Sequence, residues 1–238
     1  GEQDRMVHLD PTQTPTIHWG LDRIDQRNLP LNNTYTYNRT GAGVRIYGID
    51  TGIRYTHHEF GGRASAGFDA ITQGGNAVDC NGHGTHTSTT FAGSTYGVAK
   101  AATVIGVGVL DCTGSGTFAQ VIAGINWVTS DHQAHPGIPA VANMSLGGGA
   151  DPATDQAVTN SIASGVVYSI SAGNSTAHAC TQSPDRVPAA IPVMAAQTTA
   201  RIACTPTFGN RPANFPPAHT NHPVRPGTHP RTLPRSVH

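Results

Sequence analysis

The chain has 238 residues, which is enough for one domain with a core of useful size. Charged residues make up only 12% of it and the formal net charge is zero, so nothing in the composition indicates electrostatic capture of nucleic acid or of an anionic membrane. No apolar run approaches the roughly 20 residues that a membrane span requires. The sequence that begins at Gly1 is not a secretory signal peptide. If the protein is secreted, we expect this sequence to be the form after processing.

Short apolar runs bounded by Gly, Asp or Ser are the first pattern along the chain. They occur at residues 44–49, 104–110, 141–144 and 166–170. Runs of this length are typical of parallel strands that are buried on both faces. We therefore predict four buried strands.

Helical patterns lie between these runs. Asp151 is the expected N-cap of one helix, with Pro152 at its first position and Gly165 closing it. Strands that alternate with helices predict an α/β fold with a mostly parallel central sheet flanked by helices. A second helix has one apolar face at 3.6-residue spacing, made of Phe118, Val121, Ile122, Ile125 and Val128.

Polar residues follow the ends of three predicted strands. Asp50 follows the first, Ser145 the third and Asn174 the fourth. Functional groups of open parallel sheets gather beyond the carboxyl ends of the strands. We expect these three residues to share one edge of the sheet.

Four sequence blocks contain these residues and one further candidate, His83. Hydrolysis of a peptide needs a nucleophile, a base and donors for the developing oxyanion. His83 is the candidate base, because imidazole titrates near neutrality, and Asp50 would hold its tautomer. The blocks are Ile-Asp-Thr-Gly at 49–52, Asn-Gly-His-Gly-Thr-His at 81–86, Asn-Met-Ser-Leu-Gly-Gly at 143–148 and Ala-Gly-Asn at 172–174.

The Asp-Thr-Gly block also has a rival interpretation. Aspartic proteases use this tripeptide, but two such carboxylates face each other in them, and this chain has a single copy. A dimer would supply the second copy and would leave His83 unexplained.

With three longer segments, the blocks resemble the proteinase K and aqualysin branch of the subtilisin-like serine proteases. The segments are Trp-Gly-Leu-Asp-Arg-Ile-Asp-Gln at 19–26, Ser-Thr-Tyr-Gly-Val-Ala-Lys at 94–100 and Val-Ile-Ala-Gly-Ile-Asn-Trp-Val at 121–128. This resemblance implies the three-layer subtilisin-like fold and a secreted endopeptidase of broad specificity. It also implies that Asp50 and His83 are triad members and that Asn174 is the side-chain donor of the oxyanion hole.

The resemblance also implies how substrate binds. An extended peptide would pair as an added β-strand with two segments, and such recognition tolerates many sequences. One segment consists of Gly114, Ser115 and Gly116, and the other of Ser145, Leu146 and Gly147. For the segment at 114–116, a plain Gly-rich turn is the alternative.

Calcium is the cofactor that the resemblance implies, because hard oxygen donors suit this ion. A first site would use Asp22, Asp25 and Gln26, which fall at i, i+3 and i+4, with Asn32 and Thr34 from the loop after them. A surface carboxylate pair at a helix is the alternative. A second site would use the carbonyls of Pro188 and Ala190 with a later Asp, but no acidic residue follows Asp185, which puts this site in doubt.

The chain departs from the family pattern in its last third. The family's Gly-Thr-Ser-Met-Ala segment, whose Ser is the nucleophile at the start of a central helix, is absent, and the only serine after Ser183 is Ser236. Thr87, Ser88 and Thr89 also replace the small apolar residues that usually follow the catalytic His. We therefore keep a second interpretation open: an inactive relative that binds peptides or inhibitors.

Residues 211–238 form a tail with a different composition. They include seven Pro, four His and four Arg, and no pattern of strand or helix. Our hypothesis is an out-of-frame reading of GC-rich DNA or a sequencing error, which resequencing would test; a metal-binding appendage is the weaker alternative. The predicted organisation is an extension at 1–18, an incomplete catalytic domain at 19–210 and this tail.

The four cysteines contain no Cys-x-x-Cys pair, which favours disulfides over a zinc cluster or free thiols. A bond between Cys80 and Cys112 would tie the loop before His83 to the end of the strand near Leu110. Cys204 arrives earlier than the family's fourth cysteine, so its bond to Cys180 stays open. We expect a secreted monomer whose partners are protein or peptide substrates and a propeptide or protein inhibitor, with no nucleic acid or membrane.

Overall fold

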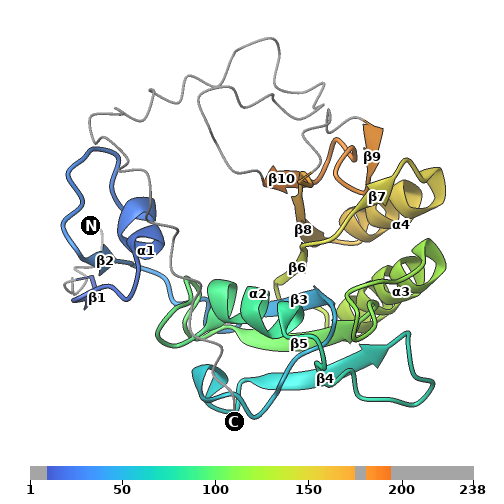
Figure 1. Ribbon diagram of the computed structural model, residues 1–238, viewed down its shortest axis with the longest axis horizontal. Coiled ribbons are helices and arrows are strands. Elements are labelled where there is room, and N and C mark those ends of the chain that lie inside the picture. The colour runs from blue at the N-terminus through green and yellow to red at the C-terminus, as the bar shows by residue number, and fades with distance from the viewer. Residues whose placement is uncertain (1–9, 175–180, 194–238) are drawn as a thin grey trace, which may run out of the picture.

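The computed structural model describes residues 10–174 and 181–193. Its centre is a six-stranded parallel sheet in the order β10-β8-β6-β3-β5-β4 (Figure 1). The strands are β3 (Arg45–Asp50), β4 (Ala64–Asp69), β5 (Thr103–Gly108), β6 (Ala140–Met144), β8 (Val166–Ser171) and β10 (Ile191–Val193).

Two small antiparallel pairs flank this sheet. One joins β1 (Thr12–Gln13) to β2 (Tyr35–Thr36), and the other joins β7 (Gly148–Gly149) to β9 (Gln182–Ser183). Two short helical segments, α1 (Trp19–Ile24) and η1 (His58–Phe60), complete the elements outside the central layers.

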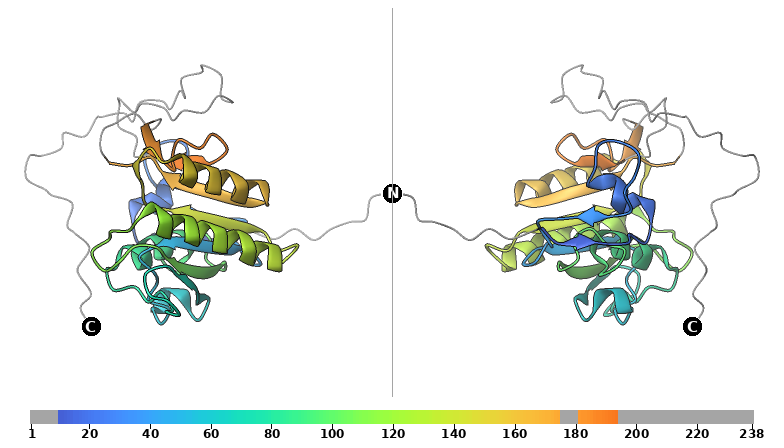
Figure 2. Two further views of the ribbon diagram at one scale, coloured as in Figure 1. Left: turned by 90° about the vertical axis from the view of Figure 1, so that its right-hand side faces the viewer. Right: turned by 90° about the vertical axis from the view of Figure 1, so that its left-hand side faces the viewer.

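Helices cover both faces of the sheet. Helices α3 (Phe118–Ala134) and α4 (Pro152–Ala163) run side by side on one face (Figure 2), and α2 (His83–Ala92) lies on the other. The alternation along β3 shows this directly: Tyr47 belongs to the core cluster with α3 and α4, whereas its neighbour Ile46 belongs to the cluster with the end of α2. The predicted α/β fold with a parallel central sheet flanked by helices is confirmed.

The predicted local structure is also confirmed. Asp151 caps α4 by accepting a hydrogen bond from the backbone N of Thr154 at 2.7 Å, and Pro152 is the first helical residue. Gly165 follows the helix with a φ of +111°. The predicted strand at 104–110 ends earlier than expected, at Gly108, and beyond it Leu110 donates its N–H to the carbonyl oxygen of Asp50, which already accepts the N–H of Val109.

One part of the sheet keeps an exposed apolar surface. Val167 of β8 points away from Tyr168 and Ile170, which pack in the core on the α4 side, so it faces the α2 side. The register places Ile191 and Val193 of β10 on that same face. These three side chains are 48%, 55% and 53% exposed, respectively. Among the described residues, no helix is long and apolar enough to cross a membrane.

Candidate active site

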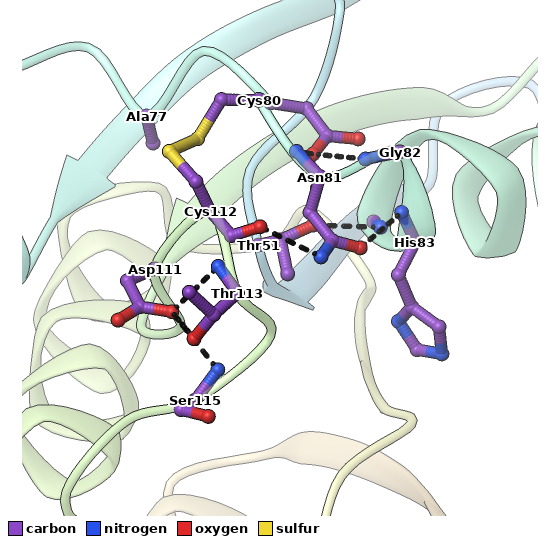
Figure 3. Close-up of a disulfide and its surroundings, with 12 residues drawn as sticks. Thr51, Ala77, Cys80, Asn81, Gly82, His83, Asp111, Cys112, Thr113 and Ser115 are labelled. Atoms are coloured by element: carbon purple, nitrogen blue, oxygen red, sulfur yellow. Dashed lines mark hydrogen bonds between the residues drawn. A yellow bond between two sulfur atoms is a disulfide. The ribbon is translucent and has the colours of Figure 1, made fainter.

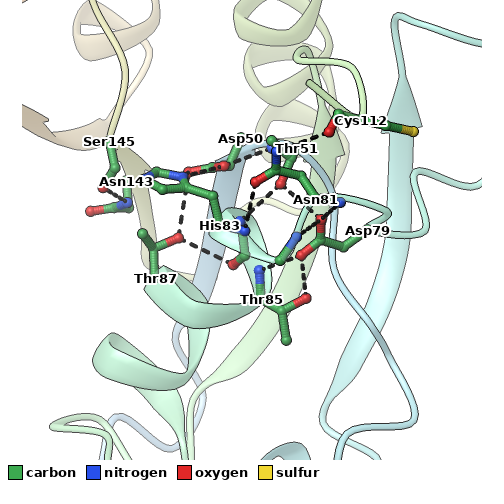
Figure 4. A network of polar contacts seen from close by, with 12 residues as sticks. Asp50, Thr51, Asp79, Asn81, His83, Thr85, Thr87, Cys112, Asn143 and Ser145 are labelled. Atoms are coloured by element: carbon green, nitrogen blue, oxygen red, sulfur yellow. Dashed lines mark hydrogen bonds and ion pairs between the residues drawn. The ribbon is translucent and has the colours of Figure 1, made fainter. Parts of the chain in front are cut away.

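Asp50 and His83 meet where the last residue of β3 faces the first residue of α2 (Figure 4). Nδ1 of His83 lies 2.8 Å from Oδ1 and 3.0 Å from Oδ2 of Asp50. The Asp50 side chain is 1% exposed and that of His83 is 47% exposed. A buried carboxylate thus holds the inner ring nitrogen, which leaves Nε2 on the accessible side of the ring.

Close approach of α2 to β3 makes this contact. Gly84 allows it, because a Cβ at this position would lie 2.2 Å from the carbonyl oxygen of Gly52 and 3.2 Å from Cβ of Asp50. Thr51 joins the two blocks: its N–H donates to Oδ1 of Asp50 at 2.7 Å, and its Oγ1 accepts the N–H of Gly84 at 2.9 Å. Both glycine-containing blocks are therefore needed to seat His83 on Asp50.

Asp79 organises the start of α2, and our sequence interpretation did not include it. Gly82 precedes the helix with a φ of +104° and has no side chain to cap it. Instead, Oδ1 of Asp79 accepts the N–H groups of Asn81 and Gly82 at 3.0 and 2.8 Å, and its Oδ2 accepts the N–H of Thr85 at 2.9 Å. An Asp shortly before a helix start is a recognisable capping signal that could have identified it.

The charge of Asp79 is stabilised by these contacts. Burial alone would raise its pKa, but hydrogen bonds from Gly82, Thr85 and Thr51 outweigh burial and lower the pKa below the ordinary value of 3.8. A carboxylate with a lowered pKa stabilises the folded state above its unfolded pKa, and this contribution is lost as the pH falls through the folded pKa.

We therefore expect Asp79→Asn to lower the free energy of unfolding at pH 7 by about 1 kcal/mol, because charged hydrogen bonds at the helix start become neutral ones. The difference from the unsubstituted chain should be full above the unfolded pKa and should shrink progressively as the pH falls through the lowered pKa of the folded state, where Asp79 becomes uncharged too. Urea unfolding at a series of pH values from 7 down to about 2 measures it. A difference that stays constant over this range would contradict the role of the charge.

The disulfide between Cys80 and Cys112 confirms one predicted pairing (Figure 3). Asn81 strengthens the same link: its Nδ2 donates to the carbonyl oxygen of Cys112 at 3.0 Å, and its Oδ1 accepts the N–H of His83 at 3.2 Å. The loop before His83 is thereby tied to the segment that follows β5. Cys180 and Cys204 lie outside the described residues.

The two predicted substrate segments both follow strand ends at the carboxyl edge. Residues 114–116 are exposed and belong to a turn that begins at Asp111. Oδ1 of Asp111 accepts the N–H of Ser115 at 3.1 Å. Ser145, Leu146 and Gly147 follow β6, and they make no backbone hydrogen bond to another described residue. An unpaired backbone of this kind is able to accept an added strand.

Asn174 lies at the same edge and is exposed, three residues after β8. Ile49 of β3 is in register with Met144 of β6, and Met144 with Ile170 of β8. Strands β3 and β8 are thus two strand spacings apart, or about 10 Å. The sheet therefore brings Asp50, Ser145 and Asn174 to one edge, with β6 between the other two strands.

Hydrogen bonds link four of the residues predicted for the first calcium site to one loop. Asp22 is buried, and its Oδ2 accepts the N–H of Asn33 at 2.6 Å, while Oδ2 of Asp25 accepts the N–H of Thr36 at 2.6 Å. Oδ1 of Asn32 accepts the N–H of Thr34 at 3.0 Å. Two carboxylates at the end of α1 are thus held against the loop at 32–36.

Gln26 lies beyond α1, which ends at Ile24, and its Nε2 donates to the carbonyls of Asn28 and Pro30 at 2.7 and 2.9 Å. Its amide therefore anchors the loop after the helix. The residues of the doubtful second site lie in the turns before β10, where Ala190 donates its N–H to the carbonyl of Val187. Pro188 in that turn is exposed. Within the described ranges, no three His, Cys, Asp or Glu side chains form a cluster that could hold a metal.

A parallel α/β sheet with an Asp–His pair at its carboxyl edge is an arrangement typical of hydrolytic enzymes. Comparison with known proteins gives the family. Residues 41–225 match the subtilase family, and the chain belongs to it.

Relatives of known name agree with this assignment. The chain is 54% identical over 208 residues to an extracellular serine proteinase of Thermus sp. (strain Rt41A), which covers 87% of this chain and 50% of that protein. It is 50% identical over 204 residues to alkaline serine exoprotease A of Vibrio alginolyticus. This match covers 83% of this chain and 37% of that protein. The chain thus spans half or less of the length of these two relatives.

A solved structure supports the fold. The crystal structure of a cold adapted subtilisin-like serine proteinase is 52% identical and superposes with a TM-score of 0.70. The superposition covers 75% of this chain and 64% of that one. The predicted subtilisin-like fold is confirmed.

Proposed function

We propose that this chain supplies the Asp–His half of the catalytic site of a secreted serine endopeptidase that hydrolyses proteins with broad specificity. The observation that carries the proposal is the buried Asp50 carboxylate on Nδ1 of a half-exposed His83. With Nδ1–H held in this way, Nε2 is a free base directed at the accessible side of the site. Asp50 would then stabilise the imidazolium that forms when His83 takes a proton.

The substrate would lie as an extended strand along the carboxyl edge. The unpaired backbone at 145–147 would bind one side of it, and residues 114–116 the other. Asn174 would direct its amide N–H at the oxyanion from across β6. The support for this placement is that β3 and β8 end at the same edge about 10 Å apart, with the unpaired backbone that follows β6 between them.

The nucleophile is the part that this chain does not supply in a recognisable setting. We propose that a segment with the serine packs on the α2 side of β8 and β10. Val167, Ile191 and Val193, which are half exposed, support this, because burying the exposed half of each would contribute about 1 kcal/mol. This segment would place the serine beside Nε2 of His83.

Calcium and secretion complete the proposal. Asp22 and Asp25 would hold a structural calcium ion with the oxygens of Gln26, Asn32 and Thr34, and the purely oxygen donor set fits this ion. The disulfide and the names of the two relatives support an extracellular location. A propeptide or a protein inhibitor would occupy the same cleft as the substrate.

Labelling with a serine-directed fluorophosphonate tests the proposal. We expect the protein isolated from its source to react and to have an intact mass above 24.7 kDa. The matched control is His83→Ala, which should abolish labelling because the serine then lacks its base. A mass of 24.7 kDa without labelling would contradict the enzyme and favour the second candidate, an inactive relative that binds peptides or inhibitors.

A further inference from the structure

The hydroxyl of Thr87 contacts the Asp50 carboxylate from the helix that carries His83 (Figure 4). Its Oγ1 lies 3.4 Å from Oδ2 of Asp50 and 3.1 Å from the carbonyl oxygen of Gly84. One hydroxyl proton is thus shared between two acceptors in a three-centre hydrogen bond. Since the family resemblance predicts a small apolar residue at position 87, this contact is a feature of the present chain.

The contact matters because Asp50 has few other donors. Oδ1 accepts the N–H of Thr51 at 2.7 Å and lies 2.8 Å from Nδ1 of His83. Oδ2 lies 3.0 Å from the same Nδ1, and Thr87 is its other donor among the described residues. The carboxylate is 1% exposed, so water does not replace a missing partner.

We propose that Thr87 is a positioning residue for the Asp50–His83 pair. Its hydroxyl holds Oδ2, which limits rotation of the carboxylate, and it withdraws negative charge from a carboxylate whose two oxygens lie 2.8 and 3.0 Å from Nδ1 of His83. Without it, Asp50 accepts a stronger hydrogen bond from Nδ1–H of His83. This inference rests on the proposed function, because it assigns Thr87 a part in holding the catalytic base.

Other threonines of α2 show what an ordinary helical threonine does here. Thr89 donates to the carbonyl of His86 at 2.8 Å, three residues back, as Thr87 does to Gly84, and its hydroxyl makes no hydrogen bond to Asp50 or His83 within the described structure. Thr89→Val therefore removes the same kind of helix contact and leaves Asp50 untouched. It is the matched control for Thr87→Val.

The test is the ¹⁵N spectrum of the histidine rings in the full chain, recorded at a pH where His83 is neutral. We expect the unsubstituted chain to show Nδ1 protonated and Nε2 bare. Thr87→Val should shift the Nδ1 signal of His83 in the direction of stronger hydrogen bonding, whereas Thr87→Ser and Thr89→Val should leave it in place. If valine at 87 prevents folding, Thr87→Ala removes the same hydroxyl with less bulk and should give the same shift.

The outcomes distinguish failure of the role of Thr87 from failure of the proposed function. An unchanged Nδ1 signal in the folded valine or alanine variant would overturn the role of Thr87 while the Asp50–His83 pair stands. A shift in Thr89→Val as large as in Thr87→Val would also overturn it, since the effect would then come from the helix alone. A His83 ring protonated on Nε2 in the unsubstituted chain would overturn the proposed function itself, and this inference with it.

Discussion

Asp50→Asn is expected to lower peptide hydrolysis by about 10⁴-fold in the protease that contains the nucleophile, the size of the loss seen when this carboxylate is changed in other serine proteases. The asparagine would keep the shape but present an N–H to His83, which favours the wrong tautomer. It would also remove the negative charge that stabilises the imidazolium. Because Asp50 is 1% exposed, water does not take over either role.

Turnover and KM on a chromogenic peptide measure this effect, and the loss should fall on turnover. Asp10→Asn is the matched control, because the same chemical change is made at an exposed position at the start of the described chain. It should keep activity within about a factor of two. Activity of Asp50→Asn within tenfold of the unsubstituted enzyme would show that this pair is not the catalytic one.

Gly84→Ala should separate His83 from Asp50 and destabilise the fold by about 1–3 kcal/mol or more. The new Cβ would lie 2.2 Å from the carbonyl oxygen of Gly52, which is backbone and has little freedom to move. The helix has to shift away from β3, and the 2.8 Å contact between Nδ1 and Oδ1 would lengthen with it. Stability and geometry are therefore lost together.

Urea unfolding and the histidine ¹⁵N spectrum measure the two effects of Gly84→Ala. Gly149→Ala is the control, since a Cβ there meets nothing within 4 Å. It should change the free energy of unfolding by less than about 0.5 kcal/mol. A Gly84 variant of unchanged stability would mean that α2 does not pack against the Asp-Thr-Gly loop as closely as the structure describes.

Much of the fold could be predicted from residues close together in the chain. The apolar runs that became β3, β5, β6 and β8 were recognisable because buried parallel strands are short and apolar throughout. The cap at Asp151 and the glycine at 165 are local features of the same kind. Asp50 and His83 could be predicted as a pair because a histidine base needs a carboxylate to hold its tautomer, and because their two blocks resemble those of a known family.

Other parts of the site depend on distant contacts. Thr87 touches Asp50 across 37 residues of sequence, and Thr51 touches Asp79 across 28. No local pattern marks these pairs, since they form only where α2 and the loop before it seat against the end of β3. The exposed apolar face of β8 and β10 could not be predicted either, because apolar strand residues have the same sequence pattern whether or not a neighbouring element covers them.

The sequence by itself determined the parallel sheet and the order of the site residues along the chain, because these reside in short apolar runs, caps and motifs, and the resemblance of its segments to known ones indicated the subtilase family. Only the tertiary structure decided that Asp50 is buried while His83 is half exposed, and which donors hold the carboxylate. The physical reason is that hydrogen-bond partners and solvent access are set by how layers pack. That packing brings together residues whose separation in the chain carries no signal.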